Sequence, residues 1–234
     1  MKIGILSDIH GNHYALAEVL RIARKEKIQK LLILGDLVGY YYHPEKALEM
    51  LKEWDMVFIK GNHEKILEQL LLKSKQGSDV QKKYGSGHSF ALKNLSTDQL
   101  QVLITAPDQQ KITFDNVKLL MCHGSPWDPD LYLYPDSEGE ILDKCNVKDV
   151  DFVLTGHSHY PFVYRNQNSV LINVGSVGQS RNMGGLASWV LINTTNKCFE
   201  LKATPYNITP LLKEIEIIDP EITYLKDILT RNNF

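Results

Sequence analysis

Short apolar runs alternate with amphipathic segments along the first part of the chain. Within residues 16–23, apolar side chains recur at i, i+3, i+4 and i+7, which predicts one buried face of a helix. A second helix is expected at about 44–53, with Pro44 in its first turn. The apolar runs predict buried strands at 2–7, 31–34 and 56–59. Strands that alternate with helices indicate βαβ units and a mostly parallel sheet.

The second half of the chain has a different pattern. Two further apolar runs, 117–122 and 152–154, each lead into a loop that contains histidine and glycine. After them, short strands separated by Asn- and Gly-rich turns are expected at 162–165, 169–174, 186–192 and 198–203. A helical tail is expected from about Thr209 onward. This half of the chain is therefore predicted to be rich in β-structure.

Residues 64–114 fit neither pattern. An apolar helix is expected over 66–72, and the segment after it is polar and contains glycine. Ser96 and Gln99 have the spacing of a capping box, which predicts another helix start. We therefore expect a helical insertion at about 64–114. No linker, repeat or low-complexity tract divides the chain, so the prediction is a single α/β domain over 1–234.

Composition and charge exclude several classes of protein. The 26 Lys and Arg residues nearly balance the 28 Asp and Glu residues, giving a net charge of −2. Bulk attraction to nucleic acid is therefore not expected. No apolar run approaches the roughly 18 residues that a membrane span needs. The three cysteines are widely separated, which argues against a disulfide framework and predicts a cytoplasmic location.

Polar side chains follow the ends of five predicted strands. They comprise two aspartates, one asparagine and five histidines: Asp8, His10, Asp36, Asn62, His63, His123, His157 and His159. Because ligands bind outside the carboxyl ends of strands in open α/β sheets, these side chains are expected to meet at one site. Oxygen and nitrogen donors of this kind suit a pair of divalent metals that share a bridging carboxylate. Glycine stands beside most of these positions, as a tight turn or a close backbone approach requires.

Each of these residues also has a structural explanation when it is taken alone. Asp8 and Asp36 could cap the helices that follow them, and Asn62 could be a turn residue. Five histidines gathered at strand ends are harder to explain in this way. The other histidines lack such a setting. His13 is expected to be exposed. His43 and His88 are expected to lie in loops that could border a cleft, although a purely structural role is favoured for both. Cys122 is expected to be a core residue.

These blocks resemble the five ordered signature blocks of the calcineurin-like metallophosphoesterases, and in particular a small prokaryotic phosphodiesterase-like branch. The blocks are Asp8-Ile9-His10-Gly11-Asn12, Gly35-Asp36, Gly61-Asn62-His63-Glu64, His123-Gly124 and Gly156-His157-Ser158-His159. The resemblance runs over about two-thirds of the chain, and Asn173–Gly178 resembles a further segment of the family. It implies an αββα sandwich, in which two mixed sheets are flanked by helices.

The resemblance also implies roles for the matching residues. Asp8, His10 and His159 would hold one metal; Asn62, His123 and His157 would hold a second; Asp36 would bridge the two. The metals would be Mn, Fe or Zn, with Mn favoured for activity, and a metal-bridging hydroxide would attack phosphorus. Asn62 and His63 are the expected catalytic residues, with His63 facing the substrate phosphate as an acid or charge stabiliser. We also expect three substrate contacts, from Arg181, Tyr41 and Trp127.

The expected substrate is small and phosphorylated, either a phosphodiester or a nucleotide-type molecule. Protein phosphatases of this family usually carry an arginine soon after the second block, whereas Asp36 is followed here by Leu37-Val38-Gly39-Tyr40. A phosphomonoesterase or a dinucleoside polyphosphate hydrolase remains an alternative on the same site. So does a non-catalytic scaffold, and an oxygen-using dimetal enzyme is a more distant alternative. The sequence leaves the oligomeric state open.

The run Tyr40-Tyr41-Tyr42 has two interpretations. The three rings could lie beside the cleft and stack on a base, or they could cover the helix expected at 44–53. The sequence does not decide between them.

Overall fold

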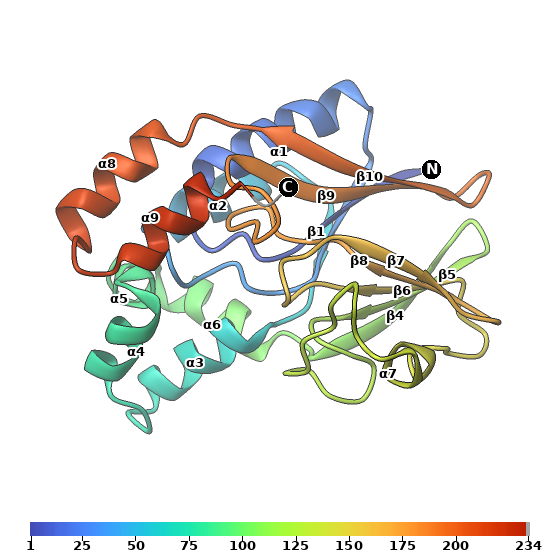
Figure 1. The fold of residues 1–234 in the computed structure, drawn as a ribbon, viewed down its shortest axis with the longest axis horizontal. Coiled ribbons are helices and arrows are strands. Elements are labelled where there is room, and N and C mark those ends of the chain that lie inside the picture. Colours follow the sequence, from blue (N-terminus) through green and yellow to red (C-terminus); the bar gives the residue numbers. More distant parts are fainter. Residues whose placement is uncertain (233–234) are drawn as a thin grey trace.

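Two five-stranded sheets pack face to face in the computed structural model, which describes residues 1–232 (Figure 1). The first sheet has the order β10-β9-β1-β2-β3, and the second has the order β4-β5-β6-β8-β7. The first contains β1 (Lys2–Leu6), β2 (Lys30–Ile33), β3 (Met56–Phe58), β9 (Leu186–Asn193) and β10 (Cys198–Pro205). The second contains β4 (Gln109–Phe114), β5 (Val117–Cys122), β6 (Phe152–Thr155), β7 (Phe162–Arg165) and β8 (Val170–Asn173).

Both sheets are mixed. In the first, β1, β2 and β3 are parallel, while β9 pairs antiparallel with both β1 and β10. In the second, β6 lies parallel to β5 and β8, while β4 and β7 are antiparallel edge strands. The expected sandwich of two mixed sheets flanked by helices is confirmed.

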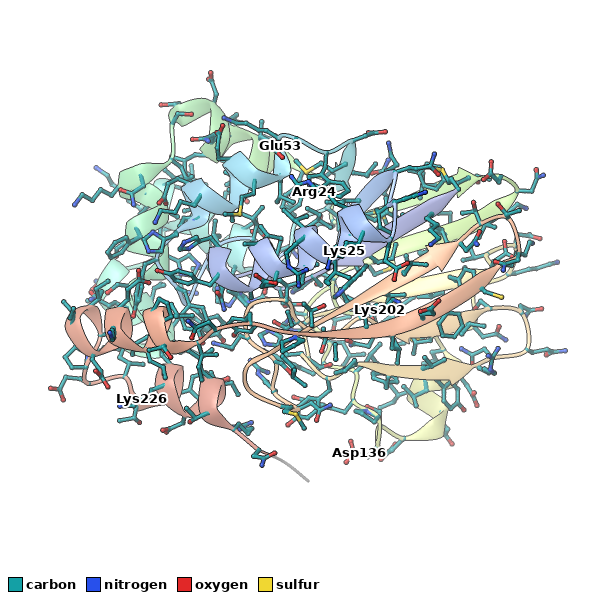
Figure 2. All side chains as sticks on the ribbon, turned by 90° about the horizontal axis from the view of Figure 1, so that it is seen from above. Arg24, Lys25, Glu53, Asp136, Lys202 and Lys226 are labelled. Atoms are coloured by element: carbon teal, nitrogen blue, oxygen red, sulfur yellow. The ribbon has the colours of Figure 1, made fainter. Side chains whose placement is uncertain are left out.

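Helices cover the outer surfaces of this sandwich. They are α1 (His13–Lys25), α2 (Pro44–Leu51), α3 (Asn62–Leu71), α4 (Gly77–Tyr84), α5 (Gly87–Asn94), α6 (Thr97–Thr105), α7 (Gly139–Asp143), α8 (Thr209–Ile218) and α9 (Thr223–Thr230). Figure 2, in which Lys25 marks α1 and Lys202 marks β10, shows α1 lying along the first sheet. The helices α3–α6 and α8–α9 gather at one end of the molecule (Figure 1). No helix among residues 1–232 is long and apolar enough to cross a membrane.

One apolar core lies between the two sheets. Ile3 and Ile5 of β1 face this layer, where they join apolar residues of the second sheet such as Met121 and Leu154. A second apolar cluster fills the space between the first sheet and its helices, and includes Leu16 and Leu20 of α1. Alternate residues of the central strand therefore bury their side chains on opposite faces, which fixes the register of β1.

The segment expected to be a helical insertion differs from the prediction in its boundaries. It contains the four helices α3–α6, which end at Thr105. The residues Gln109–Phe114 form β4, an edge strand with alternating exposed and half-buried side chains. None of its side chains is fully buried, so its sequence contains no buried apolar run that would mark a strand.

The three tyrosines lie in different environments. The Tyr40 ring packs at 4.6 Å against the ring of His10, beside the predicted site. Tyr41 and Tyr42 are completely buried and belong to an apolar cluster with α8 and α9. The Tyr41 hydroxyl donates to the Leu225 carbonyl at 3.3 Å, and the Tyr42 hydroxyl donates to Asp219 at 3.1 Å. Tyr41 and Tyr42 therefore anchor the C-terminal helices.

The loops that leave the strands carry unusual backbone conformations. Asp8, His10, Asp36, His157 and His159 have φ between 52° and 63°, in the left-handed region that residues with a side chain seldom adopt. Each such residue costs on the order of 1 kcal/mol and persists only where the surrounding structure holds it. All five were expected to bind metal, so the strain is concentrated where the site was predicted.

Candidate metal centre

One group of buried ligand atoms comes from Asp8, His10 and His159. The His159 Nε2 atom lies 3.1 Å from Asp8 Oδ1, and the His10 Nε2 atom lies 3.7 Å from the same oxygen. Asp8 and His10 follow β1, and His159 lies in the loop after β6. Residues about 150 positions apart therefore meet at the carboxyl ends of strands from the two sheets, as the sequence predicted.

A second group comes from Asp36, His123 and His157. The His123 Nε2 atom lies 3.2 Å from Asp36 Oδ2 and 3.0 Å from the Asn62 side-chain oxygen. The same Asp36 oxygen lies 3.8 Å from His10 Nε2, which belongs to the first group. The Asp36 carboxylate thus stands between the two groups.

Hydrogen bonds to backbone carbonyls orient the imidazoles. The Nδ1 atoms of His10, His123 and His159 donate to the carbonyls of Val38, Leu34 and Gln179, at 2.9, 2.7 and 2.7 Å. His157 is turned the other way, since its Nε2 atom donates to the Asp130 carbonyl at 3.1 Å. Because a neutral imidazole has one donor and one acceptor nitrogen, the unprotonated nitrogen of each ring faces the cluster.

The donor set fits divalent cations. The Nε2 atoms of His10 and His159 lie only 3.2 Å apart, and both are acceptors in the tautomers just described. The buried Asp8 Oδ1 atom has no hydrogen-bond donor among the described residues. Buried acceptors that face one another are unfavourable unless a cation or proton lies between them. The oxygen and nitrogen atoms suit Mn²⁺, Fe²⁺ or Zn²⁺.

Burial and neighbouring charges also shift the pKa values of the clustered imidazoles. Burial opposes the charge of the His123 imidazole, but the neighbouring Asp36 and Asp8 carboxylates raise its pKa to about 10. Burial lowers the pKa of His157 to about 3, and the nearby His123 adds to this shift. The environments of His123 and His157 thus shift their pKa values in opposite directions.

Glu64 joins the loop that carries Asp36 to the start of α3, where Asn62 lies. Its buried carboxylate accepts hydrogen bonds from the backbone N–H groups of Asp36, Leu37 and Gly61, each at 2.8 Å. Burial and the nearby Asp36 raise the pKa of Glu64 to about 7. Any side chain at position 61 would collide with this arrangement, because a Cβ atom there would lie 2.2 Å from Asp36 Oδ1. The sequence analysis assigned Glu64 no role, although it is part of a signature block.

His63 lies at the edge of the cluster. Its backbone N–H donates to Asp36 Oδ1 at 2.8 Å, and its ring lies 4.8 Å from that of His10. Its ligand nitrogen falls within 4.8 Å of ligand atoms of His10 and Asp36. Burial lowers the pKa of His63 well below its ordinary value, and the neighbouring His10 and His88 contribute to the shift.

His88 was expected to lie in a loop, with a purely structural role favoured, but it is a buried residue of α5. Its ring stacks on that of His63 with centroids 5.0 Å apart, and its Nε2 atom donates to the His63 carbonyl at 3.2 Å. The expectation that His13 is exposed is also wrong, because only 9% of its surface is accessible. Cys122 is buried, as expected.

The three expected substrate contacts lie in different environments. Arg181 lies beside the first ligand group, and its backbone N–H donates to the His159 carbonyl at 3.3 Å. Trp127 is 47% exposed in the loop after β5. Tyr41 has no accessible surface, so in this structure it offers nothing to a substrate.

The loop after β5 contributes a residue that the sequence analysis missed. The ring of Tyr132 stacks on that of His157 with centroids 3.9 Å apart, and the residue remains 42% exposed. Nothing in the local sequence of this proline- and aspartate-rich loop distinguishes Tyr132 from its neighbour Tyr134.

A sandwich of two mixed sheets with buried Asp and His clusters at the strand ends is the arrangement that the sequence resemblance implied. Residues 1–197 match the calcineurin-like phosphoesterase superfamily domain. The chain belongs to this superfamily, whose members are hydrolases that act on phosphoester bonds.

Known proteins resemble this chain over most of its length. An uncharacterized protein of Methanocaldococcus jannaschii is 29% identical over an alignment of 231 residues, and the match covers 91% of this chain and 91% of the other. A hypothetical protein from Pyrococcus horikoshii has a similar crystal structure, with a TM-score of 0.85, 18% identity and coverage of 99% of this chain and 98% of the other. A metallophosphoesterase from Sphaerobacter thermophilus gives a TM-score of 0.74 and 23% identity, with coverage of 93% and 94%.

Proposed function

We propose that the chain is a dinuclear metal-dependent phosphoesterase that hydrolyses phosphodiester or nucleotide-type substrates. The position of Asp36 carries this proposal. Its Oδ2 atom lies 3.8 Å from His10 Nε2 and 3.2 Å from His123 Nε2, so one carboxylate oxygen faces both ligand groups. A shared carboxylate is what a pair of neighbouring cations requires.

Two cations bound at these groups would acidify a water molecule for attack on phosphorus and neutralise charge on the phosphoryl oxygens. Asp8, His10 and His159 would hold one, Asn62, His123 and His157 the other, and Asp36 both. Mn²⁺ is the metal that we favour for activity.

His63 is the proposed acid or charge stabiliser. Its backbone N–H is bonded to Asp36, which fixes the start of α3 relative to the ligand groups, and His88 packs against its ring. A side chain in this position can donate a proton or a hydrogen bond to the oxygen that leaves phosphorus. Asn62, on the same helical turn, would contact both a metal ion and the substrate.

The cellular location that we propose is the cytoplasm. Cys122, Cys145 and Cys198 are all free thiols, and the first two are buried. Free thiols are the ordinary state of cysteine in a reducing compartment.

Turnover in the presence of Mn²⁺ tests the proposed function. The panel contains bis-p-nitrophenyl phosphate, p-nitrophenyl phosphate, a cyclic nucleotide and a dinucleoside tetraphosphate. We expect diester or nucleotide cleavage that falls about 10²- to 10⁴-fold in His63→Ala while metal content is retained. In Asp36→Asn we expect loss of both metal and activity.

Other outcomes would redirect or reject the proposal. A preference for the monoester would make the chain a phosphomonoesterase on the same site. If neither metal binding nor turnover were found with Mn²⁺, Fe²⁺ or Zn²⁺, the chain would be a non-catalytic scaffold with this fold.

A further inference from the structure

The C-terminal hairpin of helices α8 and α9 lies against the metal centre, beyond the part of the chain that matches the family domain. Lys226 of α9, labelled in Figure 2, pairs with Glu216 of α8 at 2.7 Å and joins the two helices. Asp219, between the helices, accepts hydrogen bonds from the Ser86 N–H and hydroxyl groups at 2.8 and 2.6 Å. The hairpin is therefore fixed to the helices that surround His63.

This hairpin brings Tyr224 close to a metal ligand. The Tyr224 hydroxyl donates to the side-chain oxygen of Gln179 at 3.4 Å, and the backbone carbonyl of Gln179 accepts from His159 Nδ1 at 2.7 Å. The Tyr224 ring lies 6.3 Å from that of Tyr40, which packs at 4.6 Å against His10. Two residues of the first ligand group therefore connect to Tyr224 of α9. His159 does so through Gln179, and His10 does so through Tyr40.

Arg181 lies close to His159 and Tyr132. Its backbone N–H is bonded to the His159 carbonyl, and its guanidinium carbon lies 5.9 Å from the ring centroid of Tyr132. Burial opposes its charge, but the oxygen atoms of Tyr224, Tyr40 and Tyr132 raise the pKa of the guanidinium, partly through a hydrogen bond to Tyr224. Because Tyr132 stacks on His157, Arg181 stands between ligands of both groups.

We propose that Tyr224 is a positioning residue for Arg181, and that Arg181, so held, binds a second anionic group of the substrate, the neighbouring phosphate of a nucleotide phosphate chain. This inference rests on the proposed phosphoesterase function and narrows its substrate class.

The charge of the site supports a second anionic group. Asp8, Asp36 and the hydroxide that two divalent cations would supply carry three negative charges, against four positive charges on the cations and one on Arg181. A phosphodiester with one negative charge leaves one positive charge uncompensated, and uncompensated charge in a partly buried site is unfavourable. A second phosphate compensates this charge, and the planar guanidinium can bind its oxygens in a bidentate manner.

Calorimetric binding of pyrophosphate and orthophosphate to the Mn²⁺-loaded chain tests the inference without turnover. Measurements in the His63→Ala background prevent hydrolysis. We expect Arg181→Gln to weaken pyrophosphate binding about ten- to a hundredfold, as for a lost hydrogen bond to a charged group, and orthophosphate binding much less. Tyr224→Phe, which removes only a hydroxyl group, should weaken pyrophosphate binding by about three- to tenfold.

Tyr42→Phe is the matched control. Like Tyr224→Phe, it removes one hydroxyl group that joins the hairpin to the rest of the chain. The Tyr42 hydroxyl donates to Asp219, at the turn between α8 and α9, and not to the segment that carries Arg181. We expect this variant to lower stability and to leave pyrophosphate binding unchanged. Equal effects of Tyr224→Phe and Tyr42→Phe on pyrophosphate binding would overturn the positioning role.

Kinetics separate this inference from the proposed function. In Arg181→Gln, kcat/KM should fall further for diadenosine tetraphosphate than for bis-p-nitrophenyl phosphate. Equal losses for both substrates, or a wild-type chain that cleaves the diester without binding pyrophosphate, would overturn the inference and leave the function intact. A chain that hydrolyses no phosphoester but loses pyrophosphate binding in Tyr224→Phe would reject the function alone.

Discussion

The Asp36 carboxylate has a separate contact on each of its oxygens. Oδ1 accepts the backbone N–H of His63, and Oδ2 faces the imidazoles of His10 and His123. The backbone N–H of Asp36 in turn donates to Glu64, which also binds the N–H of Gly61. The position of Asp36, the proposed bridging residue, is thus set by the buried carboxylate of Glu64, which belongs to neither ligand group.

Replacing Glu64 by Gln tests this support. The amide NH₂ group would face backbone N–H donors, so buried donors would lose their acceptor, at a cost of about 1–3 kcal/mol in the free energy of unfolding. We also expect metal affinity to fall about 10- to 100-fold, as when partners that orient metal ligands are removed. Urea unfolding of the metal-free protein and metal titration measure the two effects.

Glu68→Gln, on the half-buried surface of the same helix α3, is the control for this change. It should leave metal affinity unchanged. Equal metal affinity in Glu64→Gln and Glu68→Gln would show that the loops hold Asp36 without the Glu64 carboxylate.

Single residues of the site were predictable to different degrees. The eight residues at the strand ends do converge, because the carboxyl ends of parallel strands fix where such side chains lie. His88 was not recognised, since it reaches His63 only through the packing of α5 on α3. Tyr132 was not recognised because an exposed loop residue has no periodicity to mark it. The roles of Arg181 and Trp127 in substrate binding stay predictions.

At the scale of elements, helix α6 shows how local sequence sets a boundary. Ser96 Oγ accepts the Gln99 N–H at 3.2 Å, and Gln99 Oε1 accepts the Ser96 N–H at 2.8 Å. The capping box predicted from the sequence therefore begins the last helix before β4.

Ser96→Ala should lower the free energy of unfolding by about 1 kcal/mol, because it leaves the Gln99 N–H without its acceptor. Thermal unfolding at one metal concentration measures the change. Ser89→Ala, at an exposed position within α5, is the control and should be neutral or slightly stabilising, since alanine favours a helix interior. A loss of stability at Ser89 equal to that at Ser96 would contradict the capping role.

Elements with strong periodicity were predicted well, and those that depend on distant partners were not. The strands β1, β2, β3, β5 and β6 lie where their apolar runs indicate. The edge strand β4 was included in the helical insertion, because its side chains alternate without a fully buried face. The burial of Tyr41 and Tyr42 under α8 and α9 involves contacts between residues about 180 positions apart, which no local pattern reveals.

At the scale of the whole molecule, buried neutral histidines make stability depend on pH. His88 has 1% of its surface accessible, and burial lowers its pKa to about 4. An unfolded chain releases this proton at about pH 6.5, so between these values the unfolded state binds more protons. The free energy of unfolding therefore falls as the pH is lowered from 6.5 to 4, by up to about 3 kcal/mol from His88.

His88→Gln retains a donor for the His63 carbonyl and removes this titration. In metal-free urea unfolding at pH 8, 6, 5 and 4, we expect the variant to lose less stability than the wild type below pH 6.5. Parallel curves for the two proteins over this range would show that protonation of His88 does not oppose folding.

The place of β1 in the first sheet has a consequence for the order in which the chain folds during synthesis. This strand is synthesised well before its partner β9, which ends at Asn193, and Asp8 and His10 follow it directly. Until β9 has been made, β1 has an open edge beside Ile3 and Ile5. Closing the first sheet therefore joins residues about 190 positions apart, and such non-local steps are slow.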